Sequence, residues 1–150
     1  MAYGGGGRRV MGPLLVVNAV VCLILVGLAG WSLDKYIDGN QSHPYLGGNP
    51  STIFLLVYAL IAGVMGACSV ILGYAHLRIW SSLTLATATT SAIFSWALNA
   101  LAFGLVCKQI IMGGHRGKRL QTLEAFITIS GVTQLLYLLL LHAETFTSRF

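Results

Sequence analysis

The chain has 150 residues, of which 56% are hydrophobic and only 9% are charged, with nine Lys and Arg against four Asp and Glu. A soluble domain is usually about a quarter charged, so this composition argues against a disordered chain, a nucleic-acid-binding surface and a conventional soluble enzyme. The charges leave four long uncharged stretches, at 10–33, 39–77, 79–107 and 125–143. A helix needs roughly 20 apolar residues to cross about 30 Å of hydrocarbon. We therefore predict an all-α, polytopic membrane protein: a bundle of four transmembrane helices joined by short loops.

The first predicted span covers residues 13–31 and follows a Gly-rich, flexible N-terminal tip at 1–12. Pro13 suits the first turn of a helix, where its missing N–H has no helical acceptor in any case. Trp31 is a candidate anchor at the far membrane interface. A cleavable secretory signal is the alternative, because two arginines precede the apolar run and residues 27–29 form a small-x-small cleavage pattern. The uncharged run continues beyond that pattern, which favours retention as a span.

The second and third predicted spans cover 52–75 and 83–107, and a tight interfacial corner at 76–80 joins them. A loop rich in Gly, Pro and Asn precedes the pair at 34–50. Lys108 directly follows the third span, where its ammonium group can snorkel to the lipid headgroups. The two spans are therefore expected to form a helical hairpin.

The fourth predicted span covers 122–142 and follows a basic, Gly-rich turn. Thr122 is its candidate N-cap, and Glu124 lies in its first turn, where the helix dipole favours an acidic side chain. The transmembrane domain as a whole is expected to cover 13–143, and residues 144–150 are expected to form a C-terminal tip.

The charges do not agree on the orientation of the chain in the membrane. With four spans, both termini and the corner share one side, which carries four Lys and Arg against five on the other. The positive-inside rule then gives no bias. The first helix favours a cytoplasmic N-terminus, whereas the basic turn at 112–121 favours the opposite. Asn40 begins an N-glycosylation sequon, and a glycan there would place the first loop outside.

Small residues recur along one face of the second span at spacings of three and four residues, which is the repeat of a helix. They are Ala59, Ala62, Gly66, Ser69, Gly73 and His76. A similar face on the third span holds Thr84, Ala88, Ser91, Ser95 and Ala102, with Asn99 beside it. Small residues let two membrane helices approach closely, so we expect these two spans to pack along their faces as an antiparallel pair. The functional alternative is a polar-lined path or ligand cleft beside the third span.

Ionisable side chains lie near the predicted ends of the spans, and two interpretations of them remain open. His76, Arg78 and Lys108 either lie at the interface or bind an anionic substrate or headgroup. Glu124 is either a helix-start acid paired with the basic turn or a proton or substrate site. The polar amides inside the spans are predicted to hydrogen-bond between helices; they are Asn18, Asn99 and Gln134.

The sequence lacks the residue spacings of common catalytic and metal sites. Its three cysteines are isolated within apolar runs, which is typical of small core residues rather than of disulfides or metal ligands. No His and Cys spacing matches a zinc site, and no nucleophile has a plausible base nearby. We therefore predict neither an enzyme nor a cofactor, a metal or a nucleic-acid partner.

Six strings of the sequence, in the same order along the chain, resemble the plant AWPM-19-like family of small plasma-membrane proteins. They are GWSLDKYIDG (30–39), GNPSTIFLLVYALIAGVMGACS (48–69), HLRIW (76–80), SWALNALAFGLVCKQI (95–110), GGHRGKRLQTLEAF (113–126) and TQLLYLLLLHA (133–143). The likeness extends over residues 12–143 and leaves out only the tips. It implies a four-span plasma-membrane protein that is induced by abscisic acid and linked to drought, cold and seed maturation, and for which uptake of abscisic acid has been proposed. The family offers no established site residues to carry over.

Abscisic acid is an apolar ring that carries a carboxylate, so a carrier for it needs an apolar path with a cation or donor near the entrance. Arg78, His76 or Lys108 meets that need. Expected partners are membrane lipid and abscisic acid or a similar weak organic acid. A bundle of 16.0 kDa is small for a carrier with its own central path, which favours self-association. The alternative is a non-transporting structural or partner-binding protein that stabilises the plasma membrane under dehydration or cold.

Overall fold

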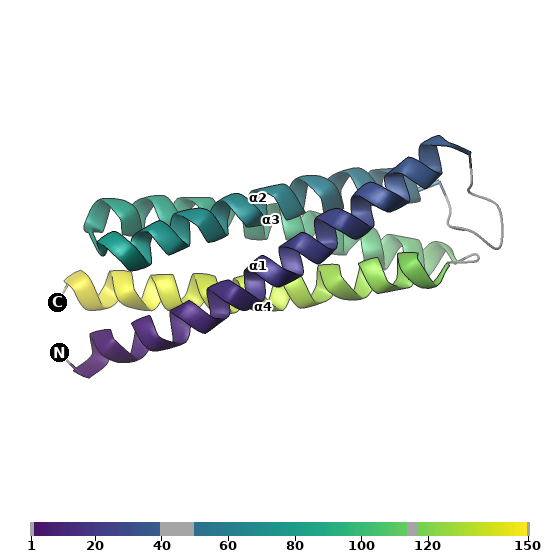
Figure 1. The fold of residues 1–150 in the computed structure, drawn as a ribbon. Coiled ribbons are helices and arrows are strands. Elements are labelled where there is room, and N and C mark those ends of the chain that lie inside the picture. Colours follow the sequence, from purple (N-terminus) through teal and green to yellow (C-terminus); the bar gives the residue numbers. More distant parts are fainter. Residues whose placement is uncertain (1, 40–49, 114–116, 150) are drawn as a thin grey trace.

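The computed structural model describes residues 2–39, 50–113 and 117–149, and in these residues the chain forms four long helices and no strand (Figure 1). They are α1 (Ala2–Ile37), α2 (Thr52–Ile79), α3 (Ser82–Met112) and α4 (Lys118–Arg149). Each of the four is long and apolar enough to cross a membrane. The predicted all-α architecture with four spans is confirmed.

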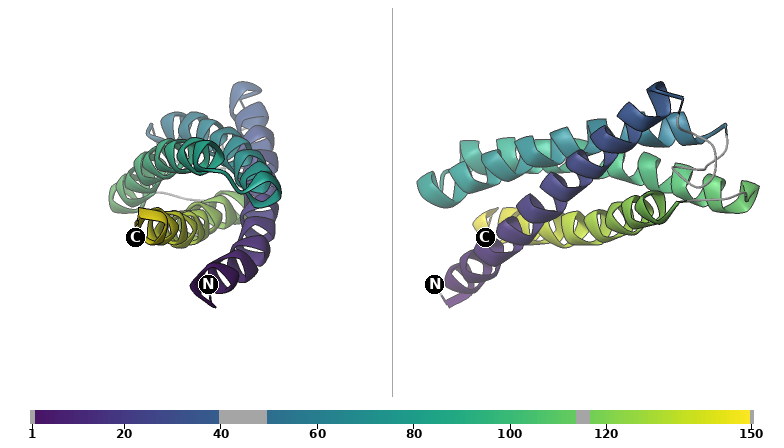
Figure 2. Two further views of the ribbon diagram at one scale, coloured as in Figure 1. Left: turned by 90° about the vertical axis from the view of Figure 1, so that its left-hand side faces the viewer. Right: turned by 45° about the vertical axis from the view of Figure 1, so that its right-hand side comes forward.

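The helices run up and down in chain order, and each packs against the helices before and after it. Contacts between α1 and α4 close the ring, which the end-on view of Figure 2 shows. Both chain termini and the corner between α2 and α3 lie at one end of the bundle, which we call the terminal end. The opposite end, where α1 leads to α2 and α3 leads to α4, is called the loop end.

The helices extend beyond the ends that the sequence predicts. The segment expected to be a flexible tip at 1–12 is helical from Ala2, and Pro13 lies inside α1 rather than in its first turn. A helix that an apolar span has nucleated gains one hydrogen bond for each further residue, so it continues past the apolar run. Pro13 removes the hydrogen bond to the carbonyl four residues earlier and crowds that carbonyl, yet the helix continues through it.

The fourth helix begins earlier than predicted, at Lys118. Thr122 is therefore not its N-cap: the Thr122 hydroxyl donates to the Lys118 carbonyl at 2.8 Å, from inside the helix. Glu124 correspondingly lies beyond the first turn and is buried, with 5% of its surface exposed. The segment expected as a tip at 144–150 is helical to Arg149.

The corner between α2 and α3 is as tight as the sequence predicts. Trp80 adopts a left-handed conformation (φ 54°) that ends α2, and its N–H donates to the carbonyl of His76 at 2.7 Å. Ser81 caps α3, because its side-chain oxygen accepts the N–H of Thr84 at 3.2 Å. The Thr84 hydroxyl accepts the N–H of Ser81 in return, at 3.1 Å, which completes a capping box.

Two apolar clusters fill the bundle, one in each half. The larger cluster lies toward the loop end and holds Leu25, Ala29, Leu55, Leu56, Ala59, Ala102, Val106, Leu120, Leu123 and Ile127. The smaller lies toward the terminal end and holds Met11, Leu15, Ala88, Ala92, Tyr137 and Leu141. Buried polar and small side chains separate the two clusters, among them Asn18, Cys22, Gly66, Ser95 and Gln134.

The small-residue face of α2 is buried along its whole length, from Ala59 to His76. It faces the axis of the bundle, where it meets α3, as expected, and also α1 and α4. A Cβ atom on Gly66 would lie 2.8 Å from Nε2 of Gln134, and one on Gly73 would meet the Tyr137 hydroxyl and lie 2.8 Å from a Leu15 methyl carbon. Four-helix bundles build their cores from such inward faces.

Candidate functional site

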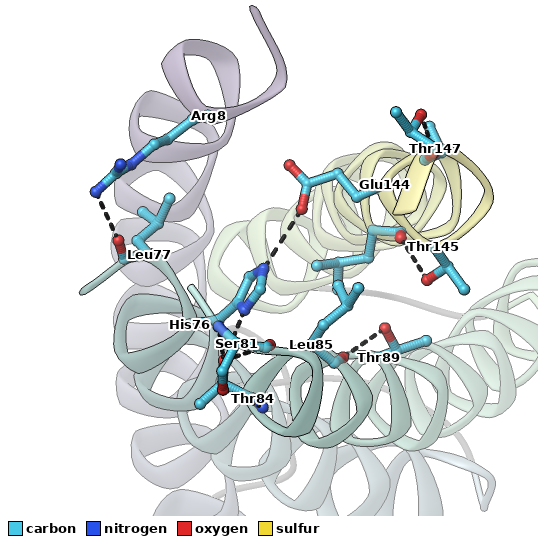
Figure 3. A network of polar contacts seen from close by, with 12 residues as sticks. Arg8, His76, Leu77, Ser81, Thr84, Leu85, Thr89, Glu144, Thr145 and Thr147 are labelled. Carbon is cyan, nitrogen blue, oxygen red and sulfur yellow. Dashed lines mark hydrogen bonds and ion pairs between the residues drawn. The ribbon is translucent and has the colours of Figure 1, made fainter. Parts of the chain in front are cut away.

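The predicted polar site residue that lies deepest at the terminal end is His76, on the last turn of α2. Only 2% of its surface is exposed, and both ring nitrogens have partners. Nδ1 lies 2.9 Å from the Thr84 hydroxyl of α3, and Nε2 lies 3.4 Å from Oε2 of Glu144 on α4 (Figure 3). His76 therefore ties three helices together at one point.

Helix α1 reaches the same cluster through Arg8. Its guanidinium donates to the Leu77 carbonyl at 3.0 Å and lies 5.3 Å from the centre of the Trp80 ring. The Trp80 ring in turn stacks on His76, with 4.8 Å between ring centres. Figure 3 shows Arg8 directed to Leu77 while Glu144 is directed to His76. We call Arg8, His76, Trp80, Thr84 and Glu144 the terminal cluster.

Like Arg8, Glu144 is a member of the terminal cluster that the sequence did not identify, because it lies in a segment expected as a tip. Its side chain is 16% exposed, and Oε1 has no hydrogen-bond partner among the described residues. The sequence feature that points to Glu144 is His76. A histidine on a face otherwise made of Ala, Gly and Ser needs a polar partner, and an acid at the far end of a neighbouring span can supply one.

The structure separates the three residues proposed as an anion site. His76 is buried in the terminal cluster, whereas Arg78 is exposed at the same end and lies 5.7 Å from the centre of the Tyr74 ring. Lys108 is exposed at the loop end, where it lines a shallow pocket with Phe54 and Tyr58. His76 and Lys108 consequently cannot bind one small anion together.

An apolar groove of about 520 Å³ runs along the outer face between α1 and α2, toward the terminal end. Its lining residues are Gly12, Leu15, Val16, Ala19, Val70, Ile71, Tyr74 and Leu77. Tyr74 belongs to both the groove and the contact with Arg78, so the guanidinium lies at the rim of the groove. An apolar body with one anionic group matches this arrangement.

The polar residues predicted within the spans lie in the centre of the bundle. Ser95 of α3 donates to Oε1 of Gln134 on α4 at 2.9 Å, and Nε2 of Gln134 lies 3.9 Å from the Cys22 sulfur of α1. Asn99 donates to the Ile127 carbonyl at 3.1 Å. The Asn18 amide is buried and has no hydrogen-bond partner among the described side chains.

Two other residues predicted as polar or helix-packing positions, Ser91 and Glu124, do not belong to this central group. Ser91 is only half-buried, and its hydroxyl donates at 2.9 Å to the Ala88 carbonyl of its own helix. Glu124 is buried near the loop end. The sequon at Asn40 and the histidine and arginine of the basic turn lie outside the described residues. Among the residues that are described, no three His, Cys, Asp or Glu side chains lie close enough to hold a metal ion.

A bundle of four membrane-spanning helices, with a buried His–Glu pair at one end and an apolar groove on its outer face, defines a small polytopic membrane protein. The sequence profile of the AWPM-19-like family matches residues 16–144, and the chain belongs to that family. The predicted resemblance is confirmed. Membrane protein PM19L of Oryza sativa subsp. japonica is 48% identical over 143 residues, which is 95% of this chain and 83% of the rice protein. No solved structure matches the chain.

Proposed function

We propose that this protein takes up abscisic acid, or a similar weak organic acid, across the plasma membrane of a plant cell as part of a response to drought or cold. Membership of the AWPM-19-like family supports the proposal, as does the similarity to a rice membrane protein. The observation that carries it is the apolar groove between α1 and α2 with Arg78 at its rim.

The chemistry of the groove fits a molecule with an apolar ring and one carboxylate. The groove volume, about 520 Å³, lies in the range of small-molecule sites. The ring of abscisic acid would lie against Leu15, Val70 and Tyr74, and its carboxylate would pair with the Arg78 guanidinium. A charge-assisted hydrogen bond of this kind contributes about 1.5–3 kcal/mol, which is enough to orient the acid with its charge toward the interface.

Uptake of labelled abscisic acid into proteoliposomes tests the proposal, with pH gradients imposed in both directions because the orientation of the chain is open. We expect time-dependent uptake that Arg78→Gln lowers roughly tenfold, as the loss of about 1.4 kcal/mol requires. Arg119→Gln is the control, since Arg119 is an exposed arginine at the loop end whose guanidinium lies over Trp31. If folded protein shows no uptake at any gradient, the carrier function is wrong. If Lys108→Gln lowers uptake as much as Arg78→Gln, Lys108 also binds the anion, and the assignment of the anion site to Arg78 at this groove is wrong.

A matched pair of glycine variants tests the groove itself. A Cβ atom on Gly12 or on Gly27 would meet nothing within 4 Å, so a side chain can start at both positions of α1 without a clash at Cβ. Only Gly12 lines the groove. Gly12→Leu should therefore lower uptake by filling the groove, whereas Gly27→Leu should leave uptake unchanged. Equal uptake in the two variants would contradict the assignment of the groove.

The alternative function, a non-transporting protein that stabilises the membrane, is favoured by the close packing at the bundle axis. Gly63, Gly66 and Gly73 each approach side chains of neighbouring helices so closely that a Cβ atom would clash. This packing suits a rigid structural bundle, or a carrier whose path follows the outer groove. Proteoliposomes that resist leakage on drying and rewetting, together with no uptake of abscisic acid, would support the structural function.

A further inference from the structure

The terminal cluster has a feature that binding of an anion at Arg78 does not use, namely a buried imidazole facing a carboxylate. His76 and Glu144 are 68 residues apart in sequence, and the closure of the bundle brings Nε2 and Oε2 to 3.4 Å. Ionisable groups held inside a membrane bundle are costly, so they mark functional sites by default.

The protonation of Nδ1 is assigned from the hydrogen bonds around Thr84. The Thr84 hydroxyl has one proton, and it donates that proton to the Ser81 carbonyl at 2.9 Å. The same oxygen accepts the N–H of Ser81 as part of the capping box. With its proton assigned to that carbonyl, the Thr84 oxygen accepts from Nδ1 at 2.9 Å, and Nδ1 carries a proton in this assignment; donation from Thr84 to Nδ1 would give the other tautomer. A neutral His76 in this tautomer presents an unprotonated Nε2 to Glu144.

An unprotonated Nε2 and an ionised carboxylate would place two lone pairs opposite each other at 3.4 Å. The contact is attractive only if one further proton lies between them, on Nε2 as an imidazolium or on Oε2 as a carboxylic acid. The surroundings of Glu144 favour holding that proton. Its Oε1 is buried without a hydrogen-bond partner among the described residues and lies 3.1 Å from the position of a Cβ atom on Gly7.

We propose that His76 and Glu144 form a proton-binding site, in which one proton is held between Nε2 and Oε2 and exchanges with the compartment at the terminal end. Binding joins the proton to a site made of a neutral imidazole and a carboxylate, and the pair becomes neutral overall. Release returns one proton to water and leaves a net charge of −1 on Glu144. The bond between α2 and α4 exists only in the protonated state.

The groups that face this site come from all four helices. From α1, Arg8 is engaged by the Leu77 carbonyl and the Trp80 ring. From the corner and α3, Ser81 and Thr84 present hydroxyls, and from α4 the Tyr137 hydroxyl is buried near Gly73, one turn before His76. His142 points elsewhere: it is exposed and contacts the Leu138 carbonyl of its own helix. No other carboxylate from the described residues contacts His76.

The proton site gains a role in transport if the proposed function holds. A weak acid moved together with the proton released from this site would accumulate on the side of higher pH. Because the bond from His76 to Glu144 holds α2 and α4 together, release of the proton frees the end of α4 beside the groove-bearing pair α1 and α2. That coupling depends on the proposed function, whereas the proton site itself does not.

Nitrogen NMR of ¹⁵N-labelled histidine in lipid nanodiscs tests the site without any transport assay. The background carries His43→Gln and His115→Gln, and the exposed His142 remains as an internal reference. We expect Nδ1 of His76 to stay protonated while Nε2 passes from protonated to unprotonated as the pH rises. In Glu144→Gln, which has no carboxylate to share the proton, the pH dependence of Nε2 should differ from that of the wild type. A neutral His76 with its proton on Nε2 at every pH from 4 to 9 would overturn the proposal.

Uptake measurements separate failure of the proton site from failure of the proposed function. If wild-type uptake follows the pH gradient, Glu144→Gln should take up abscisic acid at a rate that no longer depends on the gradient, while Glu124→Gln, a buried acid at the loop end, keeps the dependence. Titration of His76 without any uptake supports the proton site and contradicts the transport function. Uptake with a His76 that does not titrate supports transport and overturns the proton site.

Discussion

The two ends of the bundle are held together by different kinds of interaction. At the terminal end, side-chain contacts of Arg8, His76, Thr84 and Glu144 join all four helices. At the loop end the larger apolar cluster joins the helices, and the cations stack outside it: the Arg119 guanidinium lies 4.0 Å from the centre of the Trp31 ring. The loop end also buries two polar side chains, Gln109 and Glu124, whereas the proposed proton site lies at the terminal end. We therefore expect the helix contacts at the terminal end to change with pH, and those at the loop end to stay the same.

The largest effect should come from Gly73→Leu, which tests whether the terminal half of the bundle tolerates expansion. Any Cβ atom at Gly73 meets the Tyr137 hydroxyl and lies 2.8 Å from a Leu15 methyl carbon. Overpacking of this kind costs about 1–3 kcal/mol, and leucine should reach the upper part of that range. The free energy of unfolding, measured by steric trapping in bicelles, checks this. Gly104→Leu on α3 is the control, because a Cβ atom there meets nothing within 4 Å; equal losses in both variants would show that the packing at Gly73 is not decisive.

Thr84→Val should be the next most disruptive change, because it removes polar contacts of the terminal cluster. Valine keeps the shape of threonine but loses the hydroxyl that contacts Nδ1 of His76 at 2.9 Å and completes the cap of α3. Leaving a buried donor without a partner costs about 1–3 kcal/mol.

Thr87→Val is the matched control for this change, on the same helix. The Thr87 hydroxyl is exposed and donates only to the Leu83 carbonyl within α3. We expect its loss to change the free energy of unfolding by no more than about 0.5 kcal/mol. A Thr84→Val variant as stable as Thr87→Val would remove the distinction between the two ends.

The contrast between the ends also explains what could be predicted from the sequence. The number of spans follows from the uncharged stretches, since a charge inside lipid is costly wherever it falls. The inward face of α2 follows from its periodic small residues, which are buried from Ala59 to His76. Both are local signals along one helix. The apolar cluster at the loop end is accordingly close to what hydrophobic pattern alone indicates.

The terminal cluster could not be assembled in this way, because its contacts join residues far apart in the chain. Nothing near Glu144 in sequence indicates that it contacts His76, and the pair forms only when α4 closes on α1 and α2. The helix ends were misplaced for the same reason. Thr122 looks like a cap in sequence, yet the apolar face of α4 starts at Leu120, which is fully buried, so the helix begins before it.

The central polar layer between the two ends should contribute less than either of the changes above. Ser95 donates to Gln134 at 2.9 Å, across α3 and α4. Interhelical hydrogen bonds of membrane proteins average about 0.6 kcal/mol in double-mutant cycles. A cycle with Ser95→Ala and Gln134→Leu should give a coupling of that size in the free energy of unfolding. Ser91→Ala should show no coupling to Gln134→Leu, because Ser91 donates within its own helix.

The smallest effect should come from Arg119→Gln at the loop end, and comparison with Arg8→Gln measures the difference between the ends directly. Arg119 lies over Trp31, and an exposed cation–π contact contributes about 0.5–1 kcal/mol. We expect a loss near the lower limit, because the apolar cluster beneath Trp31 holds the ends of the helices without it.

Arg8 also has an aromatic contact, with Trp80, but in addition it donates to the Leu77 carbonyl and so joins α1 to the corner. Arg8→Gln should therefore lower the free energy of unfolding more than Arg119→Gln, and it should raise hydrogen exchange in the last turn of α2. Equal stability and exchange in the two variants would mean that both ends are held by their apolar cores alone.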